Sequence, residues 1–288
     1  MNTVEAPHHR VVSHKRTAKP LPISLTRRHQ DVLGALGEFP FLTVQQICKL
    51  VSGSAKALSY YRSLLRQLYD ARLVDRLFLH RFPHGSALVV YTLKRRNSVH
   101  RSLLFLEHTL AVTDFILALQ SYARLHHLSL VDVVPDWRLR RTPFSFQAAG
   151  VRYVLTPDCF VRLRLAYAGR LYELNWAVEV DRGTESIPAF RRKKLPRYLS
   201  FVQGPFQQTF GRTSPLTVVV LTTAGPRRVA DLTAGVEAEL GPTSRVDHAD
   251  LFRIGRVDFA SETPEQLLTQ PRFHVPFQRE PVALIPRP

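Results

Sequence analysis

The feature that most constrains the fold is a pair of β-rich segments on either side of Ala168-Gly169. Residues 159–168 and 171–180 are rich in β-branched and aromatic side chains, which predicts two strands joined by a tight turn. In an antiparallel hairpin the numbers of paired residues have a constant sum, so a turn centred between Ala168 and Gly169 places Asp158 opposite Glu179. We expect their β-carbons about 5 Å apart on one face of the sheet.

This hairpin predicts a cluster of acids at one end of a sheet. Asp181 shares a face with Glu179 because side chains alternate along a strand. Three converging carboxylates repel one another unless a hard cation such as Mg²⁺ lies between them. A magnesium ion held by Asp158, Glu179 and Asp181 would activate a water molecule for attack on a phosphodiester. Lys194, on the predicted following helix, completes the candidate catalytic set by stabilising the charge that develops on phosphate.

A simpler interpretation stays open for two of these acids. Glu179 and Asp181 could form surface ion pairs with nearby arginines, which would contribute little to stability. The candidate partners are Arg182, Arg191 and Arg192.

A long apolar helix is predicted over residues 99–125, and it carries Glu107 and His108. One of these two could be a further ligand or orient one, although a hydrogen-bonded structural histidine is the favoured interpretation. Tyr198 is expected in the core, and Thr184 after Gly183 is expected to cap the next helix.

The N-terminal part of the chain shows the pattern of a winged helix-turn-helix. Apolar residues at helical spacing predict three helices, and Ser52-Gly53-Ser54 supplies the tight turn between the second and third. Two β-rich runs follow, joined by a basic loop that is typical of a wing. The helices are expected from Leu25, from Thr43 and over residues 55–71; the strands over 73–79 and 87–93; and the loop over 80–85.

The side of the third helix that is predicted to face solvent carries hydroxyl, amide and cationic groups. These groups donate hydrogen bonds to phosphates and base edges in a major groove. An alternative is a winged helix used only for protein contacts, which the cationic face disfavours. The predicted DNA contacts are Lys56, Ser59, Tyr60, Arg62, Ser63 and Arg66 on the helix and Arg81 in the loop.

The charge of the chain agrees with a polyanionic partner. Lysine and arginine number 40 against 23 acids, a formal charge of +17, and nucleic acid is the commonest partner of such a surplus. Residues 186–230 hold eight basic residues and no acid, which suits either a solvated face or a rim that guides phosphates. We find no apolar run of about 18 residues and no secretion signal, so a cytoplasmic protein without membrane contact is expected. Cys48 and Cys159 are expected to be small buried hydrophobes.

Asp158 and Glu179 on adjacent predicted strands resemble the core of the PD-(D/E)xK nuclease superfamily, in which Asp on one strand is followed by Glu-x-Lys on the next. More specifically, the chain resembles the replication-relaxation family of plasmid and mobile-element proteins over residues 25–230. One departure is that Asp181 stands where the nuclease pattern has lysine, so Lys194 would have to replace it. The motifs that carry the resemblance are the winged helix, His108-Thr-Leu, Pro157-Asp158, Glu179 to Glu185, and Lys194-Leu-x-x-Tyr198.

The resemblance implies an α/β (α+β) fold: an N-terminal winged helix-turn-helix followed by a restriction-endonuclease-like mixed-sheet domain. It implies a double-stranded-DNA-binding protein of plasmid replication or DNA relaxation that need not cleave; an active magnesium-dependent endonuclease or nickase is the alternative. A homodimer and contacts with plasmid replication or mobilisation proteins are open. The expected domains are a basic disordered arm (1–22), the winged helix (23–96), the nuclease-like domain (97–258) and a proline-rich tail (259–288) that wraps the surface or is mobile.

Overall fold

The chain divides into two compact units, Met1–Arg101 and Ser102–Pro288. The computed structural model describes residues 16, 19–53, 55–79, 87–94, 102–167, 169–211, 215–241 and 249–286. Most of the predicted N-terminal arm and the predicted wing loop with Arg81 lie outside these residues. The predicted mixed α/β class is confirmed by the helices and mixed sheet that follow.

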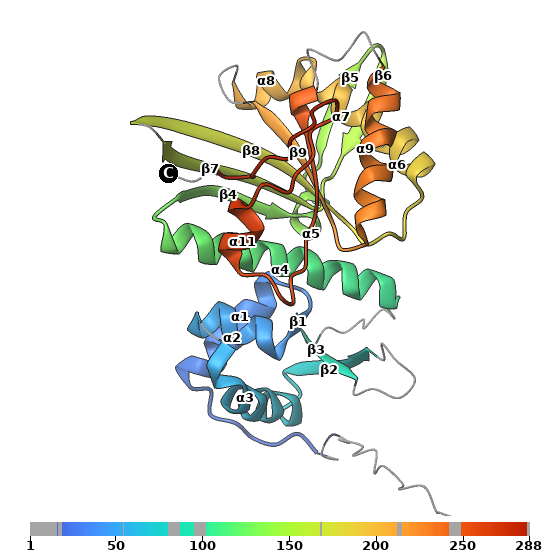
Figure 1. The fold of residues 1–288 in the computed structure, drawn as a ribbon. Coiled ribbons are helices and arrows are strands. Elements are labelled where there is room, and N and C mark those ends of the chain that lie inside the picture. The colour runs from blue at the N-terminus through green and yellow to red at the C-terminus, as the bar shows by residue number, and fades with distance from the viewer. Residues whose placement is uncertain are drawn as a thin grey trace, which may run out of the picture. The chain divides into compact units, whose positions relative to one another are not determined.

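The first unit combines helices with a three-stranded antiparallel sheet of order β1-β3-β2 (Figure 1). Thr43 begins the second helix: its hydroxyl accepts a hydrogen bond from the backbone N–H of Gln46, and its own N–H donates one to the side-chain oxygen of Gln46. Gly53 ends that helix at φ 70°, a conformation that costs glycine little. The elements are α1 (Arg27–Glu38), β1 (Leu42–Thr43), α2 (Val44–Ser52), a 3₁₀ turn (Ala55–Ala57), α3 (Leu58–Asp70), β2 (Val74–Leu79) and β3 (Leu88–Leu93).

The second unit contains a five-stranded mixed sheet of order β10-β9-β8-β7-β4 and a separate β5–β6 hairpin. Strands β4, β7 and β8 are antiparallel neighbours, whereas β8, β9 and β10 run parallel. The strands are β4 (Ser129–Pro135), β5 (Phe144–Ala148), β6 (Val151–Leu155), β7 (Cys159–Tyr167), β8 (Arg170–Asp181), β9 (Leu216–Thr222) and β10 (Phe252–Arg256). The helices are α4 (Leu103–Leu125), α5 (Asp136–Leu139), α6 (Ile187–Lys193), α7 (Leu195–Val202), α8 (Pro205–Phe210), α9 (Pro226–Leu240) and α11 (Pro264–Thr269), with a 3₁₀ turn at Ala249–Leu251.

The β7–β8 hairpin has the register that the sequence predicts. Cys159 pairs with Val178, and the pairing continues to Tyr167 opposite Arg170. On its other edge β8 runs parallel to β9, with Glu179 next to Val220. The strand that carries Glu179 is therefore the centre of the sheet, flanked by an antiparallel and a parallel neighbour.

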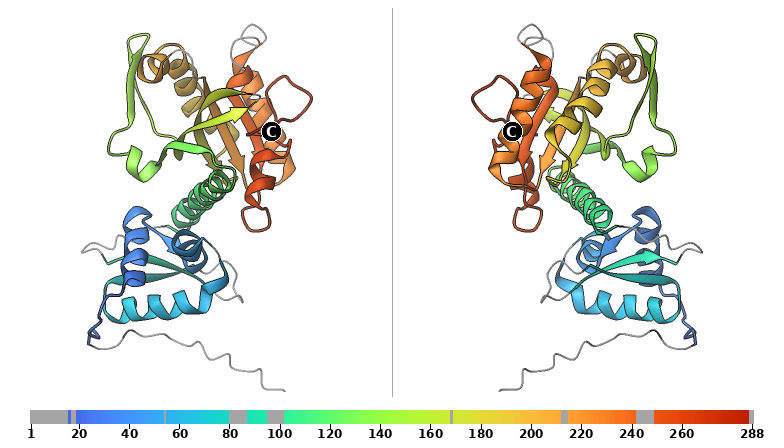
Figure 2. Two further views of the ribbon diagram at one scale, coloured as in Figure 1. Left: turned by 90° about the vertical axis from the view of Figure 1, so that its left-hand side faces the viewer. Right: turned by 90° about the vertical axis from the view of Figure 1, so that its right-hand side faces the viewer.

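Helices cover both faces of this sheet. Phe190 of α6, Tyr198 of α7 and Val236 of α9 belong to one buried cluster with Ala177 of β8. The long helix α4 contacts β4 and β8 and lies across the sheet from α6, α7 and α9 (Figures 1 and 2). Residues of β8 therefore alternate between a side covered by α7 and a side covered by α4.

Two parts of the second unit differ from the sequence expectation. The single helix expected near residues 187–201 is divided into α6 and α7 at Lys194. Pro196 has no N–H to continue the helical hydrogen bonds, and its ring clashes with the carbonyl four residues earlier. Residues 144–148 form the partner strand of β6, which the sequence did not indicate.

The proline-rich C-terminal segment packs onto the second unit. Leu267 and Leu268 of α11 are buried, and His274 pairs with Ile254 of β10. Phe273 is fully buried over Gly255, where a β-carbon would lie 2.6 Å from the ring. Gly255 is therefore required by the close approach of this segment.

Helix α4 is the most apolar long helix among the described residues. Among the described residues, one helix, Leu103–Leu125, is long and apolar enough to cross a membrane. Glu107, His108 and Asp114 interrupt its apolar sequence. Half of the most apolar part of this helix is buried within the protein, as is usual for helices in the core of globular domains.

Candidate functional site

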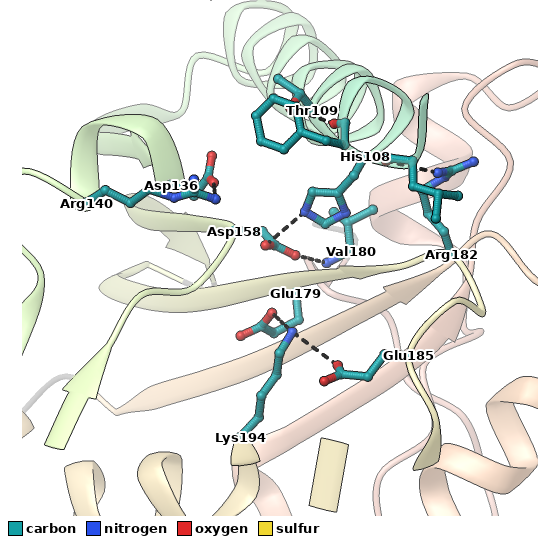
Figure 3. A network of polar contacts seen from close by, with 12 residues as sticks. His108, Thr109, Asp136, Arg140, Asp158, Glu179, Val180, Arg182, Glu185 and Lys194 are labelled. Carbon is teal, nitrogen blue, oxygen red and sulfur yellow. Dashed lines mark hydrogen bonds and ion pairs between the residues drawn. The ribbon is translucent and has the colours of Figure 1, made fainter. Parts of the chain in front are cut away.

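A histidine on α4 and an aspartate before β7 form the upper part of the site (Figure 3). Ser102 caps α4, and His108 lies one turn and a half into the helix. Its Nε2 lies 3.0 Å from Oδ1 of Asp158. Burial by itself would lower the pKa of His108, but the hydrogen bond and the negative charge of Asp158 outweigh it and raise the pKa. This hydrogen bond is consistent with both interpretations of His108 from the sequence: a structural histidine, and a residue that orients Asp158.

Asp158 is fixed by the backbone on both sides. Its Oδ2 accepts a hydrogen bond of 2.7 Å from the N–H of Val180 in β8. Its carbonyl oxygen accepts one of 2.8 Å from the N–H of Asp136, at the start of α5. Burial alone would raise the pKa of Asp158, yet the His108 and Val180 contacts hold it below its usual range. Asp158 is therefore an ionised carboxylate with both oxygens engaged.

Glu179 lies in the lower part of the site, among the helices of the other face. It is only 3% exposed. Oε2 accepts a hydrogen bond of 2.7 Å from Nζ of Lys194, and Oε1 accepts one from the hydroxyl of Tyr198. Burial raises the pKa of Glu179 to about 7 despite the positive charge of Lys194. The pKa of Lys194 is also raised, because the charges of Glu179 and Asp158 outweigh its burial.

Asp181 belongs to a different cluster. Its two oxygens accept hydrogen bonds of 2.7 and 2.9 Å from the guanidinium of Arg228 on α9. The hydroxyl of Thr222, in the neighbouring strand, donates a third at 2.7 Å. Such a bidentate, partly buried pair fixes the start of α9 against the end of β8.

The predicted convergence of three carboxyl groups is not what the structure shows. Asp158 lies towards α4, whereas Glu179 lies on the other side of β8 towards Lys194 (Figure 3). Asp158 comes just before the first paired residue of β7, where the chain bends, so the alternation of a regular strand does not orient it. Asp181 shares the face of Glu179 but turns to Arg228. The correct register therefore brings the backbones together without bringing the three carboxyl groups to one point.

The residues as placed do not fit a magnesium ion. The four oxygens of Asp158 and Glu179 each accept a hydrogen bond or ion pair from a protein group. Within the part of the chain that the structure describes, no group of three or more His, Cys, Asp or Glu side chains is arranged to hold a metal ion. Binding a cation here would require Lys194 or His108 to move away first.

Several partners of the site carried weak signals in the sequence. Tyr198 is buried as expected, but it also donates to Glu179, and the Lys194-x-x-x-Tyr198 spacing of one helical turn could have suggested this shared contact. Asp136 is buried next to Asp158 and forms an ion pair with Arg140 at 2.6 Å. Burial raises the pKa of Asp136, with the charge of Asp158 contributing in the same direction.

Two of the arginines expected to pair with Glu179 or Asp181 have other partners. Arg182 pairs with Glu107 of α4 at 2.5 Å, and Arg191 pairs with Glu239 at 3.2 Å. Cys48 and Cys159 are buried and free, and burial raises the pKa of both thiols.

In the first unit, the described residues of the predicted DNA contact lie on the exposed side of α3 and in the 3₁₀ turn before it. Tyr61, Leu65 and Leu68 face the core, as the helical spacing predicts. The opposite side is exposed, with Tyr60 at 51%. The exposed residues are Lys56, Ser59, Tyr60, Arg62, Ser63 and Arg66, whereas Arg81 lies outside the described residues.

The two units thus define an α/β protein with an exposed cationic helix in one unit and a buried ion-pair centre in the other. The family model for replication-relaxation matches residues 33–216, more than half of the chain. The chain belongs to the replication-relaxation family, which confirms the resemblance and supports a role related to replication of plasmids or mobile elements. Comparisons with curated proteins and with solved structures gave no match.

Proposed function

We propose that this protein binds double-stranded DNA through its first unit and acts in plasmid or mobile-element replication or DNA relaxation. The observation that carries the proposal is the exposed side of α3, where cations and hydroxyl groups gather over a helix whose other side is core. The proposed protein is cytoplasmic, and it acts as a homodimer or with other plasmid replication or mobilisation proteins.

The order of elements supports a winged helix for this unit. Three helices are followed by the antiparallel strands β2 and β3, and Gly53 makes the turn before the 3₁₀ turn and α3. A groove of about 430 Å³ lies between α3 and the β2–β3 strands. Arg62, Arg66 and Arg76 line it, so a phosphate backbone lying beside α3 would meet three guanidinium groups.

Replacing Lys56, Arg62 and Arg66 together by alanine is expected to weaken binding to duplex DNA by about 10- to 100-fold. Each lost phosphate contact also lowers the slope of log K against log salt by about 0.9, so we expect a total decrease of about 2 to 3. Fluorescence anisotropy with a labelled duplex at several salt concentrations measures both quantities. The matched control removes three exposed cations from elsewhere in the unit, Arg27, Arg28 and Lys49, and should change binding far less. Equal losses in the two variants would refute an interface on α3.

For the second unit we propose a nuclease-like core that binds without cutting. The antiparallel β4–β7–β8 strands, the helical crossover and the parallel β9 support the likeness to PD-(D/E)xK nucleases. The ion pairs of Glu179 with Lys194 and of Asp181 with Arg228 favour the non-cleaving alternative, because they occupy the carboxylates that would ligate Mg²⁺.

A supercoiled-plasmid assay separates the two alternatives. We expect no nicked or linear product above background, with or without Mg²⁺. Product that requires Mg²⁺ and disappears in both Glu179→Gln and Asp158→Asn would overturn the non-cleaving proposal. These near-isosteric changes keep the shape of the site, so loss of product would report chemistry; circular dichroism checks that both variants fold. Product that persists in both variants would indicate a contaminating nuclease.

A further inference from the structure

The second unit carries a cationic groove away from the acidic residues of the site. One wall is formed by residues 151–154 of β6 and the other by residues of α6 and α7. Helix α7 packs against the β5–β6 hairpin (Figure 1). The groove has a volume of about 330 Å³. Its lining includes the basic residues Arg152, Arg192, Lys193 and Arg197 and the apolar or aromatic residues Tyr153 and Val154.

The basic residues at the break between α6 and α7 have different surroundings. Lys194 turns inward to Glu179, whereas the preceding Arg192 and Lys193 are exposed in the groove. Arg197 donates a hydrogen bond of 3.3 Å from Nη1 to the carbonyl oxygen of Val154. This contact ties α7 to the hairpin and uses one of the five N–H donors of the guanidinium group.

The charge of this groove is not balanced by acids of its own. Among the residues that the structure describes, none that lines it is Asp or Glu. Within the described part of the chain, Arg192 and Lys193 form no ion pair, whereas the adjacent Arg191 pairs with Glu239. Four cations so close together repel one another, and an anion in the groove would relieve that repulsion.

The apolar and aromatic residues that line the groove limit which anions fit it. Val154 is 42% exposed, and Tyr153 is stacked on Phe146 at 5.5 Å. An extended ligand with regularly spaced anionic groups and apolar faces between them satisfies both features. The sugar–phosphate backbone of DNA has this alternation.

We propose that this groove binds the DNA backbone as a second contact site, separate from α3. The choice of DNA as ligand rests on the proposed function, but the site itself depends on no residue of the first unit. We expect this contact to be independent of base sequence, because its cations would meet phosphates and not the edges of bases.

The test uses the full-length protein and the double variant Arg192→Gln/Lys193→Gln. Both side chains are exposed and without ion pairs among the described residues, so the fold should be unaffected, as circular dichroism and thermal unfolding would verify. We expect affinity for a labelled duplex to fall about 5- to 20-fold and the salt slope to decrease by about 2. The control Arg124→Gln/Arg170→Gln removes the same charge from exposed positions of this unit.

Comparison with the α3 variant distinguishes the two proposals. Loss in the groove variant, with the control like wild type, supports the groove whether or not the α3 variant loses binding. Equal losses of affinity in the groove variant and the control would show that net charge alone causes the loss, which would refute a site in the groove. An unchanged groove variant would refute the second site, and the proposal for α3 would then be judged by its own variant.

Discussion

Replacing Lys194 by methionine is expected to lower the free energy of unfolding by about 3 kcal/mol near pH 8. The change leaves the carboxylate of Glu179 buried without its cation, and breaking a buried pair in this way costs about 3–5 kcal/mol. The lower end applies because the Lys194 side chain is 33% exposed. Urea unfolding followed by circular dichroism measures the loss.

The loss should depend on pH in a defined direction. The pKa of Glu179, already about 7, rises further without Lys194, so the folded variant retains a proton that the unfolded chain releases. A raised acid pKa means that stability falls as pH rises from the unfolded value towards the folded one. The deficit relative to wild type should therefore be smaller near pH 5 than near pH 8.

A second variant tests the cause of that loss. In Glu179→Gln/Lys194→Met both charges are removed, and the amide can still accept from Tyr198. We expect its stability within about 1 kcal/mol of wild type, because replacing a whole buried pair is often neutral. A double variant as unstable as Lys194→Met, or a deficit that is the same at both pH values, would show that the ion pair is not the origin of the effect.

Asp158→Ala is expected to destabilise the second unit by about 3 kcal/mol. It removes the acceptor of the Val180 N–H and the partner of His108 at once, and both groups are then left without that acceptor in a largely buried place. Denaturant unfolding measures the loss. The control Asp132→Ala removes a carboxylate that is 44% exposed and pairs with Arg162 on the same sheet. That change should cost less than about 1 kcal/mol.

The milder Asp158→Asn links the loss to the His108 contact. The amide oxygen still accepts a hydrogen bond, so most of the stability should remain. The negative charge is gone, so the pKa of His108 should fall below its wild-type value in an NMR titration. An unchanged His108 pKa would mean that Asp158 does not hold the imidazole in solution.

The strands around the site were predictable because their information is local. The alternation of side chains and the short turn are enough to place Cys159 opposite Val178, as the structure has it. The core side of α3 followed equally from helical spacing. By contrast, the direction of the Asp158 side chain depends on a bend next to β7. The partner of Asp181 is Arg228, which is 47 residues away along the chain.

The sequence by itself thus determined the mixed α/β class, the hairpin register and the cationic side of α3, since these depend on periodicity and on neighbours along the chain. The tertiary structure decided where the carboxyl groups point and which cations they meet. It gave Asp158, Glu179 and Asp181 three separate partners: His108 of α4, Lys194 at the junction of α6 and α7, and Arg228 of α9. The physical reason is that a buried carboxylate needs whichever donor the packing brings within reach, and packing is a property of the whole fold.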